Sequence, residues 1–76
     1  MTNMPIEELN LNWRIVQKLK KNGIHLVNTL IEKSEGDLWN ECRLSRVELA
    51  EINRQLIGIG VSLKLDKDDI TYLMLN

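Results

Sequence analysis

Basic side chains near two short turns are the residues of this sequence with the clearest chemical potential. Arg14 and Lys18 precede the first turn, and Arg43 and Arg46 lie on either side of the second. Side chains of this kind beside a helix N-terminus can hold a phosphate, because the amides and the dipole of the helix also attract an anion. If two helical hairpins pack together, we expect Arg14, Arg43 and Arg46 to converge. The alternative is a basic helix face that is only solvated.

The second turn is also a strong signal for a helix start. Ser45 is followed three residues later by Glu48, which is the spacing of a capping box. In that arrangement the Glu48 carboxylate occupies the positive helix end that an incoming phosphate would need. The stretch CRLSRVELAEI at 42–52 therefore indicates a capped helix first, and a phosphate site at Ser45 only second.

Other kinds of site have little support. The chain has one histidine, His25, and one cysteine, Cys42, and two such residues so far apart do not suggest a metal site. Cys42 is more simply explained as a half-buried small side chain than as a reactive thiol. Glycine-rich phosphate loops, dinucleotide-binding motifs and nucleophile elbows are absent from the sequence. We predict no enzyme, no cofactor, no metal site and no small-molecule substrate.

Length and composition limit the class of protein. A chain of 76 residues predicts a single domain over 1–76 with one small core. Ten basic and eleven acidic residues give a net charge of -1, so affinity for a polyanion has to come from a local cluster. The sequence has no disulfide framework, no secretory signal pattern and no apolar stretch long enough to cross a bilayer. We therefore predict a cytoplasmic protein with no membrane segment.

Capping residues and helical spacing predict an all-α fold, a compact bundle of four to five short helices. The expected elements are one helical turn over 5–9, helices over 13–21 and 25–32, a short helix over Leu38 and Trp39 that Ser34 opens, and a helix over 45–57. The expected N-caps are Asn12, Ser34 and Ser45. The expected inner faces carry Trp13, Ile15, Val16 and Leu19 in the first long helix, and Leu49, Ile52, Leu56 and Ile59 in the last. Two helix–turn–helix units of this size give the bundle helix-hairpin-helix character.

The C-terminal stretch allows several structures. Val61, Leu63 and Leu65 alternate with polar residues, and Ile70 to Leu75 is mostly apolar. The pattern fits an extended tail, a hairpin or a short Asp-capped helix equally well. Such a segment can either cover the small core or support self-association through Ile70 to Leu75.

Several short pieces of the sequence together carry a family resemblance. They are PIEELNL at 5–11, Arg14, LKKNGI at 19–24, Thr29-Leu30, Asp37-Leu38, Leu44 and GVSL at 60–63. With these pieces, residues 5–63 resemble the C-terminal domain of the bacterial RNA polymerase α subunit, and 64–76 would be a C-terminal extension. Because the chain begins with its own Met, we expect a free-standing relative of that domain. The resemblance implies a compact helical domain that binds the DNA minor groove upstream of promoters and contacts transcription factors.

The resemblance also implies roles for single residues. The arginine of the family at the position of Arg14 enters the minor groove, and an asparagine of the family stands where this protein has Gln17. The family has a glycine at the position of Ser45, a basic residue at Val47 and a serine at Glu48, and these three hold a phosphate. Their replacement here implies weaker phosphate binding.

Two functions follow as expectations. The first is weak binding to A/T-rich duplex DNA in transcription, since a narrow minor groove concentrates negative potential. Its candidate residues are Arg14, Gln17, Lys18, Arg43, Ser45 and Arg46. The second is a protein-interaction module of the transcription machinery that has kept the fold and lost most DNA contacts.

Overall fold

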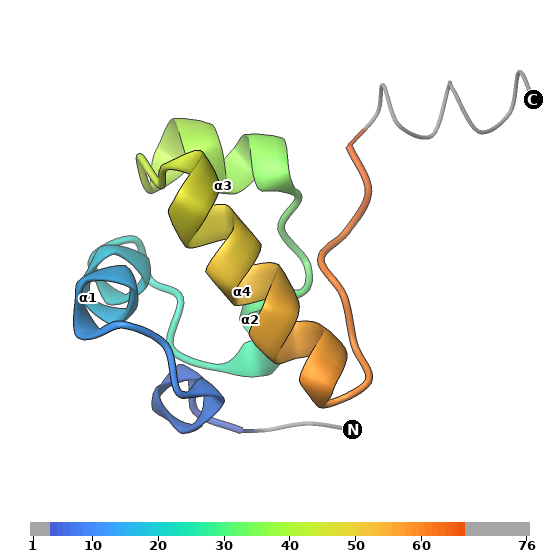
Figure 1. Ribbon diagram of the computed structural model, residues 1–76. Coiled ribbons are helices and arrows are strands. Elements are labelled where there is room, and N and C mark those ends of the chain that lie inside the picture. The colour runs from blue at the N-terminus through green and yellow to red at the C-terminus, as the bar shows by residue number, and fades with distance from the viewer. Residues whose placement is uncertain (1–3, 67–76) are drawn as a thin grey trace, which may run out of the picture.

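The fold consists of short helices joined by tight turns. A computed structural model describes residues 4–66. These residues form a 3₁₀ helix, η1 (Ile6–Leu9), and four α-helices, α1 (Trp13–Lys21), α2 (Val27–Leu30), α3 (Glu35–Glu41) and α4 (Arg46–Gly58), with no strand among them. The prediction of an all-α fold is confirmed. Helix α4 runs through the centre of the view in Figure 1, with α3 across its N-terminal end and α1 and η1 to one side.

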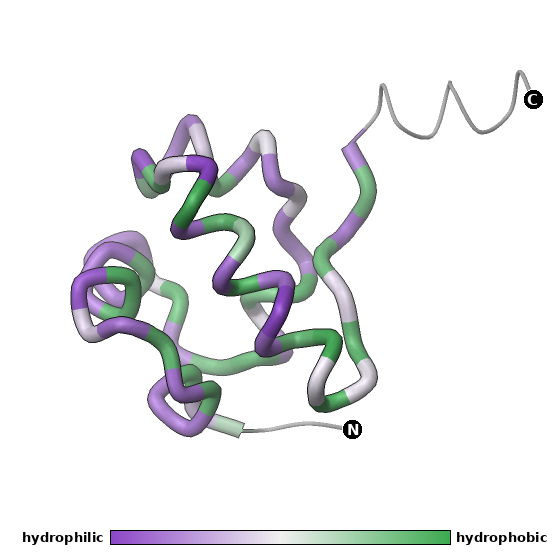
Figure 2. The backbone as a smooth tube through the Cα atoms, viewed as in Figure 1, coloured by the Kyte–Doolittle hydropathy of each residue, from purple (hydrophilic) through white to green (hydrophobic). Residues whose placement is uncertain are grey.

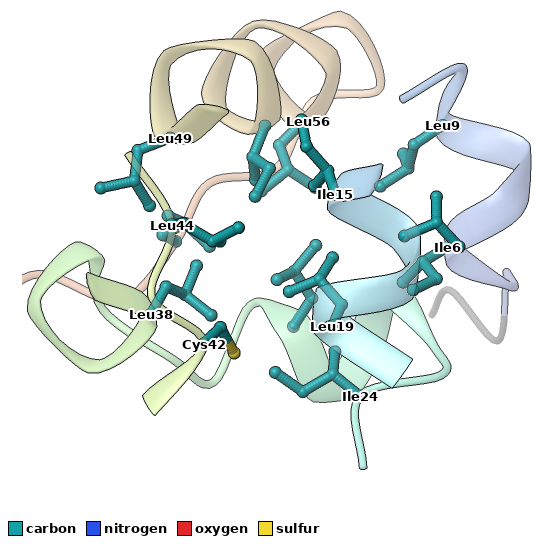
Figure 3. Close-up of a cluster of buried hydrophobic side chains, with 14 of the residues drawn as sticks. Ile6, Leu9, Ile15, Leu19, Ile24, Leu38, Cys42, Leu44, Leu49 and Leu56 are labelled. Atoms are coloured by element: carbon teal, nitrogen blue, oxygen red, sulfur yellow. The ribbon is translucent and has the colours of Figure 1, made fainter. Parts of the chain in front are cut away.

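One hydrophobic cluster fills the space between these helices. Along α1 and α4, hydrophobic positions alternate with hydrophilic ones, so each helix has an apolar face (Figure 2). The side chains of these faces point into a common interior (Figure 3). The buried residues are Ile6, Leu9, Ile15, Val16, Leu19, Ile24, Val27, Leu30, Leu38, Cys42, Leu44, Leu49, Ile52, Leu56 and Leu63. In the described residues, no helix is both long enough and apolar enough to cross a membrane.

Two residues expected on the inner faces lie outside the core. Trp13 is 69% exposed and Ile59 is 40% exposed. An α-helix turns by about 100° per residue, so Ile15, Val16 and Leu19 share one arc and Trp13 lies beyond its edge. Ile59 follows the last residue of α4 and no longer continues the apolar stripe of the helix. The burial predicted for both residues was wrong.

All three predicted N-caps are confirmed. The Asn12 side-chain oxygen accepts a hydrogen bond from the backbone N–H of Arg14 at 2.8 Å. Ser34 and Ser45 each form a complete capping box, the first with Asp37 and the second with Glu48. These bonds satisfy amides that have no partner inside the helix, so they fix where α1, α3 and α4 begin.

Helix α2 is shorter than the predicted span of 25–32. It covers only Val27–Leu30, and its N-cap residue provides no side-chain hydrogen bond. The backbone before it pairs with the N-terminal segment instead: Ile6 donates its N–H to the His25 carbonyl at 3.1 Å, and Val27 donates to the Met4 carbonyl at 2.8 Å. Because residue 25 is held in this extended pairing, it cannot be helical.

After α4 the backbone turns back and runs toward the start of α3 (Figure 1). Leu63 is buried, and the Lys64 N–H donates to the Lys33 carbonyl at 3.0 Å. The Asp66 carboxylate then accepts the Gly36 N–H, with its two oxygens at 3.2 and 3.3 Å. The extended alternative therefore holds for residues 61–66. The apolar segment Ile70 to Leu75 lies outside the described residues.

The Asp66 contact explains a glycine near the start of a helix, where it weakens helix formation. A Cβ atom at Gly36 would lie 2.7 Å from the Asp66 carboxylate oxygen, which is closer than such atoms pack. Glycine at this position lets a carboxylate from a distant part of the sequence reach the N-terminal amides of α3.

Candidate nucleic-acid interface

The outer face of α1 presents Arg14 and Gln17 one helical turn apart. Both side chains are exposed. The backbone N–H of Arg14 is held by the Asn12 cap, and within residues 4–66 no ion pair or hydrogen bond engages the Arg14 guanidinium. The structure thus places a free guanidinium on the first turn of a well-anchored helix.

Glu51 fixes the start of α1 from the opposite helix. Its carboxylate accepts the backbone N–H of Asn12 at 2.7 Å. Asn12 in turn caps the helix at Arg14, so a short series of hydrogen bonds runs from α4 to the residue proposed to enter the groove. The sequence did not indicate this role for Glu51, because the two residues are 39 positions apart and no local pattern joins them.

The N-terminal end of α4 is already held by a carboxylate of the protein itself. One Glu48 oxygen accepts the Ser45 N–H at 2.9 Å, and the Ser45 hydroxyl accepts the Glu48 N–H at 3.2 Å. The same Glu48 oxygen lies 2.9 Å from the Lys18 ammonium. Two candidate phosphate ligands, Ser45 and Lys18, are therefore both engaged by Glu48.

Electrostatics of the turn agree with this geometry. The pKa of Glu48 is lowered, chiefly because its carboxylate accepts the Ser45 amide and then because of the Lys18 ammonium, while partial burial acts in the opposite direction. A lowered pKa means that the folded protein favours the ionised carboxylate. An incoming phosphate would have to compete with a charged group that already satisfies this helix end.

The lowered pKa of Glu48 predicts a contribution to stability that acid removes. A carboxylate with a lower pKa in the folded state stabilises the fold above its unfolded pKa, and the effect disappears as pH falls through the folded value. Glu48→Gln should therefore have a lower free energy of unfolding than wild type at neutral pH. The difference should begin to shrink as pH drops below the ordinary glutamate value of 4.5 and should vanish only below the lowered pKa of the folded state. Urea unfolding of both proteins across this range is the measurement, and a difference that does not change with pH would contradict it.

The cap itself gives a second stability prediction. Ser45→Ala removes the hydroxyl that accepts the Glu48 N–H, and we expect a loss of about 1 kcal/mol in the free energy of unfolding. Ser45→Asn is the matched control, because asparagine is as good an N-cap. Thermal or urea melts would compare the three proteins. An alanine variant as stable as wild type would show that this hydrogen bond adds nothing.

The two arginines beside the second turn lie on either side of Trp39. Arg43 lines one surface depression with Lys18 and Trp39, and Arg46 lines a second one with Trp39. Arg43 has a φ of 55°, so its backbone is left-handed, and its carbonyl accepts the Lys18 ammonium at 3.4 Å. The structure thus brings Lys18, Arg43 and Ser45 together. No described contact joins Arg14 or Arg46 to that group.

Cys42 is part of the core. It is 4% exposed, and burial is the main cause that raises the pKa of its thiol. A raised pKa disfavours the reactive thiolate. The geometry fits a packing role for Cys42. Its side chain is almost completely buried, whereas the sequence predicted that it would be half-buried.

Comparison of the amino-acid sequence with those of known proteins identifies the family to which this protein belongs. The sequence profile of the C-terminal domain of the bacterial RNA polymerase alpha subunit matches residues 1–57. The DNA-directed RNA polymerase subunit alpha of Saccharopolyspora erythraea is 41% identical over 61 residues, which are 80% of this sequence and 17% of that protein. The same subunit of Carboxydothermus hydrogenoformans is 35% identical over 68 residues, 90% of this sequence and 22% of that protein. The 76 residues thus span only a small part of these relatives. The protein belongs to the family formed by the C-terminal domains of bacterial RNA polymerase α subunits.

Proposed function

We propose that this protein is a non-enzymatic DNA-binding domain that acts in cytoplasmic transcription. Its relatives are α subunits of RNA polymerase, which supports a role beside that enzyme. The observation that carries the proposal is Arg14. Its guanidinium is exposed and unpaired within the described residues, on a helix start fixed by Asn12 and Glu51.

The proposed contact is insertion of Arg14 into a narrow A/T-rich minor groove. Guanidinium groups are favoured there because the two phosphate backbones approach each other and strengthen the negative potential. Gln17 lies one turn further along the same face, where its amide can bond to a base edge or a sugar oxygen. No large groove or deep pocket is needed for this mode of binding.

The second turn contributes little to the proposed affinity. Glu48 holds the amide end of α4 and pairs with Lys18, so Arg43 and Arg46 are the remaining phosphate ligands near the turn. With a net charge of -1 the protein as a whole adds no general attraction to DNA. Binding should accordingly be weak.

The test is a titration of fluorescent A/T-rich duplex at several salt concentrations, with a G/C-rich duplex of equal length as control. We expect tighter binding to the A/T-rich duplex. The slope of log affinity against log salt concentration should correspond to roughly two to three neutralised phosphates. If neither duplex binds at low salt, the protein is not a DNA-binding domain.

A second candidate function has its own supporting observation. At the start of α4, Val47 is 77% exposed, next to Glu48. An apolar side chain and a carboxylate suit a protein surface better than a phosphate backbone. We propose as the alternative a protein-interaction domain of the transcription machinery. This alternative predicts that the folded, stable protein binds neither duplex in the titration described above.

A further inference from the structure

Trp39 stands between two hollows on the surface, and each hollow contains an arginine. The Trp39 side chain is 50% exposed. On one side lies a depression of 330 Å³ that Arg43 and Leu44 help to line. On the other lies a depression of 240 Å³ lined in part by Arg46 and Leu49. Each space has room for one or two side chains of another molecule.

The net charge of the residues that line these hollows is positive. Arg43 and Arg46 are exposed, and neither has a carboxylate partner within residues 4–66. The two carboxylates that line the hollows are already engaged. Glu48 is ion-paired with Lys18 and bonded to its own helix cap, whereas Glu35 accepts the Asn53 amide at 2.9 Å and keeps its negative charge, which the two arginines outnumber. A ligand meeting this surface therefore finds two free guanidiniums, which bind carboxylates in a paired, two-point geometry.

The apolar part of the surface selects the kind of ligand. Half of Trp39 faces solvent, and the nearly buried Leu44 and Leu49 add apolar surface to the lining of the two hollows. A DNA backbone has phosphates for the arginines but little apolar surface to cover a tryptophan. A protein segment supplies both. Tryptophan and arginine are also the residue types that most often dominate the free energy of protein–protein binding.

The parts of this surface are held in place before any ligand arrives. Trp39 lies in α3, which packs against α4, and the turn between the two helices carries Arg43. The capping box of α4 holds the position of Arg46 as its first residue. A preformed surface costs less to order on binding than a flexible one.

We propose that Trp39, Arg43 and Arg46 form a docking site for an acidic amphipathic segment of a partner protein. Its carboxylates pair with the two arginines, and its apolar side chains cover Trp39 and enter the hollows. The proposal specifies the partner for the protein-interaction function, the second of the two proposed above, and on that function it rests. It does not involve Arg14.

A peptide selection tests the proposal without knowledge of the partner. A displayed library of random dodecapeptides is selected on the wild-type protein and counter-selected on the double variant Arg43→Glu with Arg46→Glu. The enriched peptides should carry net negative charge together with aromatic or aliphatic residues. The best of them is then synthesised and titrated into Trp13→Phe, in which Trp39 is the one remaining tryptophan and reports binding by its fluorescence.

The matched variants give the specificity of the effect. Arg43→Glu with Arg46→Glu should weaken peptide binding by more than about tenfold, and Trp39→Ala by a similar factor. Binding to Trp39→Ala is followed by the anisotropy of a fluorescein-labelled peptide, because this variant lacks the reporting tryptophan. Arg54→Glu changes an exposed arginine elsewhere on α4 and should leave binding unchanged. Melting curves establish that each variant is folded, and Arg43→Gln with Arg46→Gln replaces the charge reversal if that variant is not.

Several outcomes would overturn the proposal. They are a selection without enrichment, enrichment of basic peptides, and equal binding of the peptide by wild type and the charge variants. A Trp39 signal that responds to A/T-rich duplex but to no peptide would assign the surface to nucleic acid instead. Peptide binding that survives in Arg14→Ala supports the docking site even where DNA binding has failed, so the two proposed functions are tested apart.

Discussion

Arg14→Ala should reduce binding to A/T-rich duplex to the background level. Loss of an arginine that reads a groove costs roughly 1 to 3 kcal/mol of binding free energy, which is enough to make a weak interaction undetectable. The Asn12 cap holds the backbone of Arg14 in place on the outer face of α1, and its guanidinium, unpaired within residues 4–66, stays free to bind DNA. Lys18 on the same helix is already paired with Glu48. Fluorescence anisotropy with labelled duplex at low salt is the measurement.

The control for this variant lies on the same helix. Lys21→Ala removes the same charge from the last turn of α1, and its side chain is also exposed. It should weaken binding only slightly and uniformly, as loss of general attraction does. Both variants should melt as the wild type does, because neither side chain is in the core. If the two variants bind equally well, Arg14 has no special contact with DNA.

The second large effect is a gain. Val47→Lys combined with Glu48→Ser should strengthen DNA binding and steepen its salt dependence by about two phosphate contacts. The substitutions add one cation at the second turn and remove the carboxylate that holds the amide end of α4. The change also releases Lys18 from its ion pair, so that its ammonium can reach a phosphate.

Single variants separate the causes of this gain. Glu48→Gln removes the charge but keeps an acceptor for the Ser45 amide, so it should show part of the gain through Lys18 alone. Val47→Lys alone should add about one contact to the salt slope. A double variant that binds no better than wild type would show that the second turn does not face DNA at all.

Features that depend on neighbouring residues could be predicted from the sequence. The limits of α1 and the three N-caps follow from signals within one helical turn, and they hold in the structure. The conflict between a capped helix and a phosphate site at Ser45 could also be anticipated, because both uses need the same amides. The buried positions Leu49, Ile52 and Leu56 follow from helical spacing alone.

Features that depend on distant residues could not be predicted. The pairing of Pro5 with Leu26 shortens α2, and no periodicity in the sequence indicates this pairing. The bonds from Glu51 to Asn12 and from Lys18 to Glu48 join helices whose relative placement the sequence does not reveal. The same contacts decide which candidate residues are free to meet DNA, and so the candidate site was harder to predict than the helices that carry it.

The contact between Asp66 and Gly36 also has a consequence for the order in which the protein can form on the ribosome. The N-caps Asn12, Ser34 and Ser45 each lie directly before the helix they start, so they are available as soon as that helix has been synthesised. The Asp66 carboxylate reaches back 30 positions to the Gly36 amide in the first turn of α3. In a nascent polypeptide, α3 therefore has its own serine cap but lacks this second contact until residue 66 has left the exit tunnel.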